Sequence, residues 1–306
     1  YPLRRQRQMC IRDRIRSDNN LFLFQRNSGK FIRKIGVIGK GPEEYSNPID
    51  NFFNPYNNKI YTYGSYLRTI VKVFSLEGKY IESFSTPEIN EKESMKNYPI
   101  SEFIDSSTFI GYIENSTGKI SKRIVIFTKQ AEKASYPQYN KWPSDHISWS
   151  QRPIFFNWGN HLSFKEKSND TVFYFTPERL VPRFVLNTGK KTHPYSSRID
   201  EVQEEGENPK DYLYITNMFE NVEFLFFYLV FKNEPVRNKP GVFHLVHNLC
   251  ILNKNTREVF VSKNDGDPLY GIMDDINEFI PVLPITISGN NELVSILMAP
   301  KVVQWR

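Results

Sequence analysis

The sequence has little cysteine and no long apolar run, and each lack excludes a class of protein. Only Cys10 and Cys250 occur in 306 residues, so a disulfide framework that replaces a hydrophobic core is excluded. Cys250 lies in an apolar, strand-like run, where a single thiol behaves as a small buried hydrophobe. No stretch reaches the roughly 18 apolar residues of a membrane-spanning helix. With 39% hydrophobic and 24% charged residues, the chain can bury a sizeable core of its own.

The glycine-rich stretch IGVIGKGPEEY, residues 35–45, does not match a phosphate-binding loop. Lys40 is followed by Gly41 and Pro42, whereas a phosphate loop needs serine or threonine there and a helix after it. The spacing of the three glycines also differs from that of a dinucleotide fingerprint. The stretch is therefore predicted to be a bend between strands, in which Gly39 and Gly41 take a positive φ and Pro42 fixes the exit.

The net positive charge is concentrated at the start of the chain. Residues 1–16 hold six arginines and one aspartate, a net charge of +5, which leaves +1 of the total +6 for residues 17–306. The string RRQRQMCIRD resembles translated sequencing-adapter read-through, and the rival interpretation is a basic arm for nucleic acid or targeting. We expect residues 1–16 to be a non-native or disordered tail, and we expect no nucleic-acid partner. A missing signal sequence then says nothing about the compartment, because the place where it would stand is overwritten.

The rest of the chain has the alternating periodicity of β-strands and repeats itself. FQRNSGKFIRKI (24–35) aligns with VFSLEGKYIESF (73–84), and YNNKIYTY (56–63) aligns with DSSTFIGY (105–112), both with an offset of 49 residues. A period of 40–50 residues with about four strands per unit is typical of β-propeller blades. The sequence therefore predicts an all-β chain over residues 17–306, a single six-bladed propeller of four-stranded blades. A partial blade before residue 36, four fuller blades and an incomplete blade after about residue 275 indicate truncation at both ends.

The same repeats resemble a known family. GKFIRKIGVIGKGPEEY, VFSLEGKYIESF, SNDTVFYF before VPRFVLNTGKK, and KNDGDPLYGIMDDINEFIPV are similar to the six-bladed propellers of Bacteroides-type bacteria, relatives of the NHL-repeat propellers. The resemblance covers residues 20–300 and implies a protein of the cell envelope, either periplasmic, an outer-membrane lipoprotein, or secreted. It also implies a signal sequence and a lipid anchor that this chain would lack, the anchor being its one expected link to a membrane.

An aromatic segment, YPQYNKWPSDHISWSQRP (136–153), interrupts the repeat and is the candidate ligand site. Aromatic faces beside polar groups suit sugar rings or peptides, and loops at the mouth of a propeller often bind ligands. The alternative is a loop that caps a blade with its tryptophans buried, and the sequence leaves both open. The candidate ligand-binding residues are Tyr139, Trp142, His146, Trp149 and Arg152.

Two possible metal sites have weaker support. The acidic run NDGDPLYGIMDDINE contains Asp265, Asp267, Asp274 and Asp275, oxygen donors that could hold Ca²⁺, the one cofactor considered. Its spacing is not that of an EF-hand, which favours a solvated loop. His244 and His247 are three residues apart on one strand, so they point to opposite faces and cannot share a metal. Histidines from separate blades could still meet at the central channel, as in lyase relatives of the NHL propellers.

The function expected from the sequence is recognition without catalysis. The chain has no Gly-x-Ser-x-Gly elbow and no Ser/His/Asp set, so an enzymatic interpretation rests on fold analogy alone. We expect a non-enzymatic envelope propeller whose loop face binds a glycan, a peptide or a protein. The alternative is a propeller hydrolase or lyase with a metal ion at the central channel.

Overall fold

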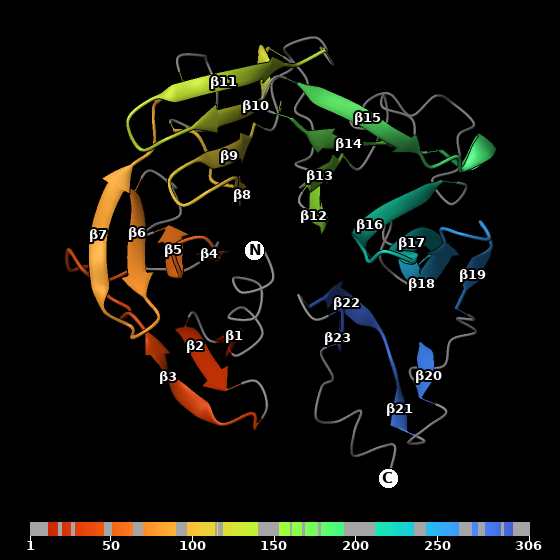
Figure 1. The fold of residues 1–306 in the computed structure, drawn as a ribbon, viewed down its shortest axis with the longest axis horizontal. Helices are drawn as coiled ribbons and strands as arrows, with labels where there is room; N and C mark the ends of the chain where they lie inside the picture. Colours follow the sequence, from red (N-terminus) through yellow and green to blue (C-terminus); the bar gives the residue numbers. More distant parts are fainter. Residues whose placement is uncertain are drawn as a thin grey trace. The chain divides into compact units, whose positions relative to one another are not determined.

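The computed structural model shows an all-β chain. It describes residues 12–17, 20–25, 28–45, 51–63, 70–89, 97–113, 115, 119–139, 153–159, 161–166, 169–176, 179–192, 212–235, 243–262, 271–274, 279–288 and 291–295. Within these ranges the only helix is one 3₁₀ turn, η1 (Gly189–Lys191). The chain divides into two compact units, Tyr1–Ser150 and Gln151–Arg306, and the strands of both are labelled in Figure 1.

The first unit contains three antiparallel sheets of consecutive strands. The first sheet consists of β1 (Arg12–Ser17), β2 (Asn20–Gln25) and β3 (Phe31–Ile35). The second consists of β4 (Asn51–Asn54), β5 (Lys59–Tyr63), β6 (Ile70–Ser75) and β7 (Tyr80–Ser85). The third consists of β8 (Glu102–Phe103), β9 (Phe109–Tyr112), β10 (Lys122–Phe127) and β11 (Glu132–Pro137).

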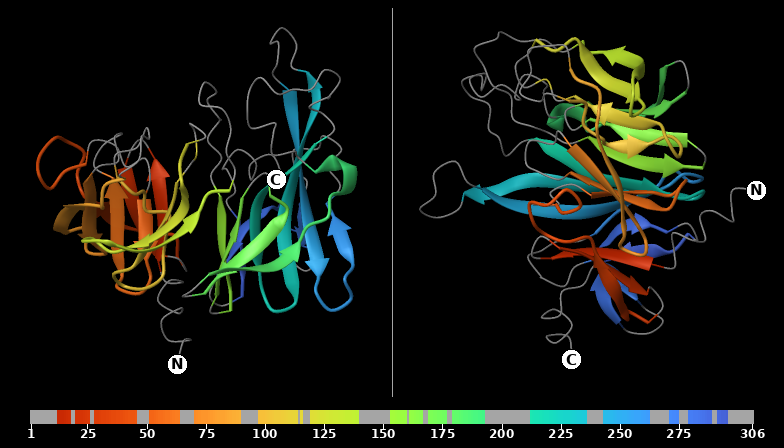
Figure 2. Two further views of the ribbon diagram at one scale, coloured as in Figure 1. Left: turned by 90° about the horizontal axis from the view of Figure 1, so that it is seen from above. Right: turned by 90° about the vertical axis from the view of Figure 1, so that its left-hand side faces the viewer.

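The second unit contains two four-stranded antiparallel sheets and two strand pairs. One sheet consists of β12 (Ile154–Trp158), β13 (His161–Lys165), β14 (Thr171–Phe175) and β15 (Leu180–Val185). The next consists of β16 (Leu213–Glu220), β17 (Phe224–Pro235), β18 (Phe243–Asn253) and β19 (Val259–Val261). The pairs are β20 (Ile272–Asp274) with β21 (Phe279–Val282), and β22 (Pro284–Ile287) with β23 (Leu293–Ser295). Strands β17 and β18 extend past their neighbours in Figure 2.

These sheets confirm the predicted fold class, a propeller of four-stranded blades. The four full sheets lie where the sequence placed four fuller blades, and a three-stranded sheet precedes residue 36. The count of six blades stays a prediction. The first sheet begins at Arg12, inside the segment that the sequence analysis set apart as a tail, because β1 pairs with β2 from Arg12 to Ser17. Backbone pairing of this kind needs no apolar side chain.

Adjacent sheets within each unit share an apolar core. Between the first two sheets lies a cluster that includes Leu23, Ile35, Ile60 and Phe74, all 0–1% exposed. A second cluster joins sheets β4–β7 and β8–β11, and a third joins sheets β12–β15 and β16–β19. A single sheet of this kind has two apolar faces and cannot cover them itself, so each sheet is stable only beside a neighbour. Burial of each large side chain contributes about 1.5–3 kcal/mol.

The glycine-rich stretch is the connection from β3 to β4, as predicted, but the positive φ belongs to a different glycine. Gly36 has φ +65°, whereas Gly39 and Gly41 are outside the positive region. The reason is packing: Tyr45 folds back over the turn, its hydroxyl donates to the Ile35 carbonyl at 2.8 Å, and its ring lies edge-on against Phe74. The bend therefore places the Tyr45 ring in the apolar core between the first two sheets.

Gly36→Ala is expected to destabilise the first unit more than Gly29→Ala. Both glycines have a positive φ, but a Cβ on Gly36 would lie 2.6 Å from the Tyr45 ring and 2.9 Å from the Phe74 ring, whereas Gly29 has no atom within 4 Å. We expect losses of about 2 kcal/mol and about 1 kcal/mol in the free energy of unfolding, respectively. Urea unfolding of both variants measures this, and equal losses would contradict the packing argument.

Candidate functional site

Polar side chains gather at one end of sheet β12–β15, where the β13–β14 loop meets the connection from β15 to β16. The Thr192 hydroxyl donates to the Asp170 carboxylate at 2.8 Å and lies 2.7 Å from the Thr188 hydroxyl. The Leu186 amide donates to the Asp170 carbonyl at 2.9 Å. Thr192 then forms a parallel bridge with Leu213, where β16 starts. These hydrogen bonds hold the two loops together. We call the part of the sheet formed by Asp170, Leu186, Thr188 and Thr192 the loop end.

Lys165 is the buried base of the loop end. It is the last residue of β13 and only 1% exposed. By strand alternation its side chain lies on the same sheet face as Ser163, and its ammonium donates to the Glu166 carbonyl at 2.8 Å. Burial lowers the pKa of Lys165 to about 8, and the nearby carboxylates of Asp170 and Glu166 oppose that shift.

An amine that loses its proton near pH 8 could act as a base or a nucleophile. Here the position argues against that role, because both Lys165 and the following Glu166 are almost fully buried. No solute of substrate size reaches a group that is 1% exposed unless the sheets separate. We therefore interpret Lys165 as a residue that supports the loops from beneath.

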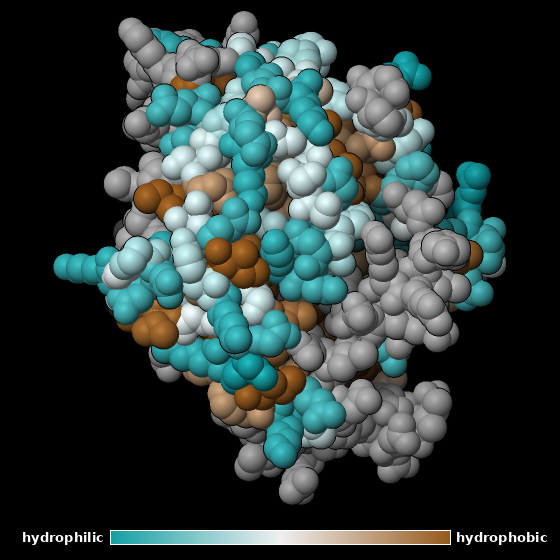
Figure 3. All heavy atoms as spheres, turned by 60° about the vertical axis from the view of Figure 1, so that its left-hand side comes forward, coloured by the Kyte–Doolittle hydropathy of each residue, from teal (hydrophilic) through white to brown (hydrophobic). Residues whose placement is uncertain are grey.

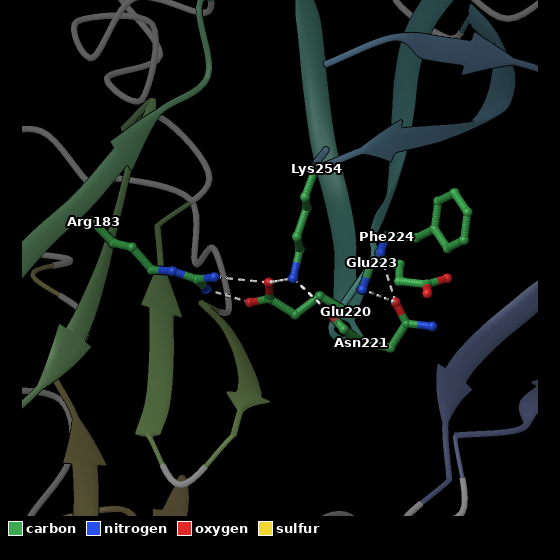
Figure 4. Close-up of polar contacts among 6 residues, drawn as sticks. All are labelled: Arg183, Glu220, Asn221, Glu223, Phe224 and Lys254. Atoms are coloured by element: carbon green, nitrogen blue, oxygen red, sulfur yellow. Dashed lines mark hydrogen bonds and ion pairs between the residues drawn. The ribbon is translucent and has the colours of Figure 1, made fainter. Parts of the chain in front are cut away.

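A buried carboxylate joins sheets β12–β15 and β16–β19 (Figure 4). The Glu220 side chain is 0% exposed and forms ion pairs with Arg183 of β15 and with Lys254 in the β18–β19 turn. The Arg183 contact is bidentate, with the second bond at 2.8 Å, and Lys254 also donates to the Asn221 carbonyl. One carboxylate thus accepts from two cations. Its place between sheets indicates a structural role.

The same kind of contact recurs in the first unit. Arg33 of β3 donates to the Glu77 carbonyl in the β6–β7 turn at 2.8 Å, and Glu82 of β7 pairs with Lys129 in the β10–β11 turn. Arg33 and Glu82 occupy equivalent positions of the 49-residue repeat. In each case the middle of an outer strand binds the neighbouring sheet, at or beside the turn between its last two strands. The polar contacts between sheets therefore follow the repeat although the charges change sign.

Another cluster of ionisable side chains lies at the edge of sheet β8–β11. Tyr98 donates to the Glu132 carboxylate at 2.5 Å, and Lys122 donates to the same oxygen at 2.6 Å. Burial raises the pKa of Tyr98, and the hydrogen bond to Glu132 adds to that rise. Burial also raises the pKa of Glu132, but the hydrogen bonds from Lys122 and Tyr98 outweigh this effect and leave the pKa of its carboxyl lowered. The arrangement holds the Tyr98 proton rather than releasing it, which suits structure and not catalysis.

Of the predicted ligand-binding residues, one lies within the described structure. Tyr139 follows β11 and its side chain is 77% exposed. Trp142, His146, Trp149 and Arg152 lie outside the described residues. The structure therefore places Tyr139 of the aromatic segment at the surface.

The predicted acidic metal site lies almost entirely outside the described structure. Asp265, Asp267 and Asp275 are not described, and Asp274 is placed only as the last residue of β20. Among the described residues, no three His, Cys, Asp or Glu side chains are grouped to hold a metal ion. Those same residues form no helix long and apolar enough to cross a membrane. Cys250 is buried, as predicted, and burial raises its pKa to about 11, so the thiol is unreactive.

A family model described as "Domain of unknown function (DUF4934)" matches residues 9–306. The chain belongs to the DUF4934 family. The match begins inside the arginine-rich segment, as does β1. No functionally curated protein matches this DUF4934 chain.

Solved structures similar to this DUF4934 protein include two from Bacteroides. A member of the DUF4221 family from Bacteroides vulgatus has a TM-score of 0.56 at 10% identity, and the match covers 81% of this chain and 79% of that one. A candidate exported protein from Bacteroides fragilis has a TM-score of 0.49 at 15% identity, with 82% and 70% covered. The DUF4221 match shows a shared fold and nothing of the activity.

Proposed function

We propose that this DUF4934 protein is a non-enzymatic binding scaffold of the bacterial cell envelope, exported or held there by a lipid anchor, whose loop face recognises a glycan, a peptide or a protein. The envelope location is supported by the family resemblance of the repeats. The recognition role is supported by the exposed aromatic side chain at the start of the loop segment. The buried, paired state of Lys165 and Glu220 supports a rigid support rather than catalytic chemistry.

Tyr139 is the observation that carries the proposal. It follows Gln138, which is buried, whereas Tyr139 itself is 77% exposed. If the aromatic segment were a cap whose rings fill a core, its first aromatic residue beyond the strand would be covered. An exposed tyrosine instead offers a flat apolar face and a hydroxyl that can donate or accept, the combination that sugar rings and peptides use. The chemistry of the site therefore favours recognition over capping.

Glycan and peptide arrays probed with the purified chain test the proposal. Once an array ligand is found, Tyr139→Ala is expected to weaken it at least tenfold, about 1.4 kcal/mol, with no change in thermal unfolding because the ring makes little packing. Trp142→Ala is expected to weaken the same ligand. Tyr56→Ala is the matched control, since Tyr56 is an exposed tyrosine in the β4–β5 turn.

Two results would contradict recognition by the aromatic segment. One is an array ligand that Tyr139→Ala and Trp142→Ala bind as tightly as the unmodified chain. The other is unfolding caused by Trp142→Ala, which would show that the segment is a cap. A stoichiometric metal ion in purified protein would instead favour the hydrolase or lyase alternative.

A further inference from the structure

The outermost strand of sheet β16–β19 is apolar on both faces and exposed. In β19 the residues Val259, Phe260 and Val261 are 53%, 56% and 54% exposed. The sheet order places β19 beside β18, and no other described strand lies along its free edge. Three consecutive large apolar side chains in a solvent-facing edge strand are unusual, because such edges template the addition of another strand.

The other outer strands of the same molecule provide an internal comparison. Strands β7 and β11 alternate between half-buried and exposed residues, and each of the four other outer strands carries charge or proline that discourages pairing. These residues are Arg33 and Lys34 in β3, Glu82 in β7, Glu132, Lys133 and Pro137 in β11, and Pro182 and Arg183 in β15. On the side of the first unit that faces the viewer in Figure 3, apolar side chains form separate spots among polar ones. In strand β19 all three residues are exposed, and none of them is charged or a proline.

The register shows what an added strand would meet. Val259 and Val261 lie opposite Leu252 and Cys250 of the apolar core shared with sheet β12–β15. Phe260 lies opposite Ile251, on the other face. A strand beside β19 would therefore continue both apolar faces of the sheet by one more row.

The ladder also shows which backbone groups are free to pair. The Asn253 amide donates to the Glu258 carbonyl, and the Ser262 amide donates to the Leu249 carbonyl. Because antiparallel hydrogen-bonded pairs alternate, the amide and carbonyl of Phe260 point to β18, whereas those of Val259 and Val261 point away from the sheet. The free edge thus offers two donors and two acceptors at the spacing of a strand.

We propose that β19 is a docking edge at which an extended apolar segment of a partner protein adds as a fifth strand to sheet β16–β19. The partner segment has β-branched or aromatic residues at successive positions, so that one row extends the Val259 and Val261 face and the other extends the Phe260 face. A second copy of the chain is a poorer occupant, because a three-residue edge buries far less than the roughly 1,200 Å² of a stable interface. The docking edge uses none of the residues of the aromatic loop segment, so this proposal does not depend on the proposed function.

The test uses the full chain and a panel of synthetic nine-residue peptides with Val, Ile or Phe at successive central positions and Lys at both ends. Fluorescence anisotropy is expected to show saturable binding of at least one peptide. Val261→Pro removes an outward amide without touching the bonds to β18, and it is expected to weaken that peptide tenfold or more. Val222→Thr, at an exposed valine in the β16–β17 turn, is the matched control and is expected to bind normally.

A peptide methylated on the alternate backbone nitrogens that would face β19 keeps the apolar side chains but loses the donors to the Val259 and Val261 carbonyls, and strand addition predicts that it does not bind. This measurement stays decisive if Val261→Pro fails to fold. Equal binding of the methylated peptide, or no binding of any peptide to the unmodified chain, would overturn the proposal. So would a dimer in solution that Val261→Pro disperses, since the occupant would then be a second copy.

Discussion

Replacing Glu220 by alanine is expected to lower the free energy of unfolding by about 3–5 kcal/mol, the cost of removing one partner from a buried ion pair. The Glu220 carboxylate is the shared acceptor of Arg183 and Lys254, and its side chain has no exposed surface. Removal leaves two cations facing a cavity between sheets β12–β15 and β16–β19. The Arg183 and Lys254 side chains are only 13% and 22% exposed, so their charged groups cannot be fully hydrated there without separating the sheets.

Urea unfolding measures the effect as a lower midpoint at unchanged slope. Glu258→Ala is the control, because this carboxylate is exposed on the same sheet and its loss is expected to change stability by less than about 0.5 kcal/mol. A variant with Arg183→Met, Glu220→Leu and Lys254→Met together is expected to recover most of the loss, since it leaves no unpaired charge. If Glu220→Ala and Glu258→Ala unfold at the same midpoint, the buried ion pairs do not hold the two sheets together.

The sheets could be predicted from the sequence because the strands repeat with one period. The two pairs of segments 49 residues apart correspond to β2–β3 with β6–β7 and to β5 with β9. Turn glycines fixed the hairpins as well: Gly29 and Gly78 both have a positive φ. At Gly36 the sequence was less informative, since three glycines stand close together and only the packing of Tyr45 selects one of them.

The contacts between sheets were not predicted, because their partners are far apart in the chain and change type from repeat to repeat. Arg183 and Glu220 are 37 residues apart, and Glu82 and Lys129 are 47 apart. A signal did exist. Arg33 and Glu82 fall on one position of the repeat, and the charged residue at the centre of β3, of β7 and of β15 has a partner in the next sheet. The sign of the charge had to come from the structure.

Lys165 was also missed, for a different reason. SFKEKSND (163–170) is mostly polar and is typical of an exposed turn, yet Ser163, Lys165 and Glu166 are all buried. Burial here is decided by the neighbouring sheet, whose apolar side chains Ile215 and Phe227 share a core with Phe156 and Val172. The local sequence does not indicate which face of β13 packs against that core, so the burial of Lys165 could not be predicted from it.

The burial of Lys165 leads to an expected rise of stability with pH. Its pKa is about 8 in the folded chain against an ordinary 10.5, so between these values the unfolded chain holds a proton that the folded chain lacks. The penalty for burying the charge is fully present below pH 8 and is relieved as pH rises towards 10.5, so stability increases with pH across that window. The whole difference is about 3 kcal/mol, of which about 2 kcal/mol falls between pH 7 and pH 9.5.

Urea midpoints at pH 7 and pH 9.5 for the unmodified chain, Lys165→Met and Lys190→Met measure this contribution. Other groups also titrate in the interval, and burial raises the pKa of tyrosines such as Tyr45 and Tyr61, which lowers stability at still higher pH. The comparison between variants removes these shared effects. Lys165→Met is expected to lose about 2 kcal/mol of the pH-dependent gain, whereas Lys190→Met, at an exposed lysine in η1, keeps it.

A second variant tests the charges around Lys165. Because Asp170 and Glu166 are the charged groups that oppose the shift, Asp170→Asn is expected to lower the Lys165 pKa further, so that stability begins to rise at a lower pH. Identical pH profiles for the unmodified chain and Lys165→Met would show that the ammonium is solvated and that the loop end does not rest on a buried lysine.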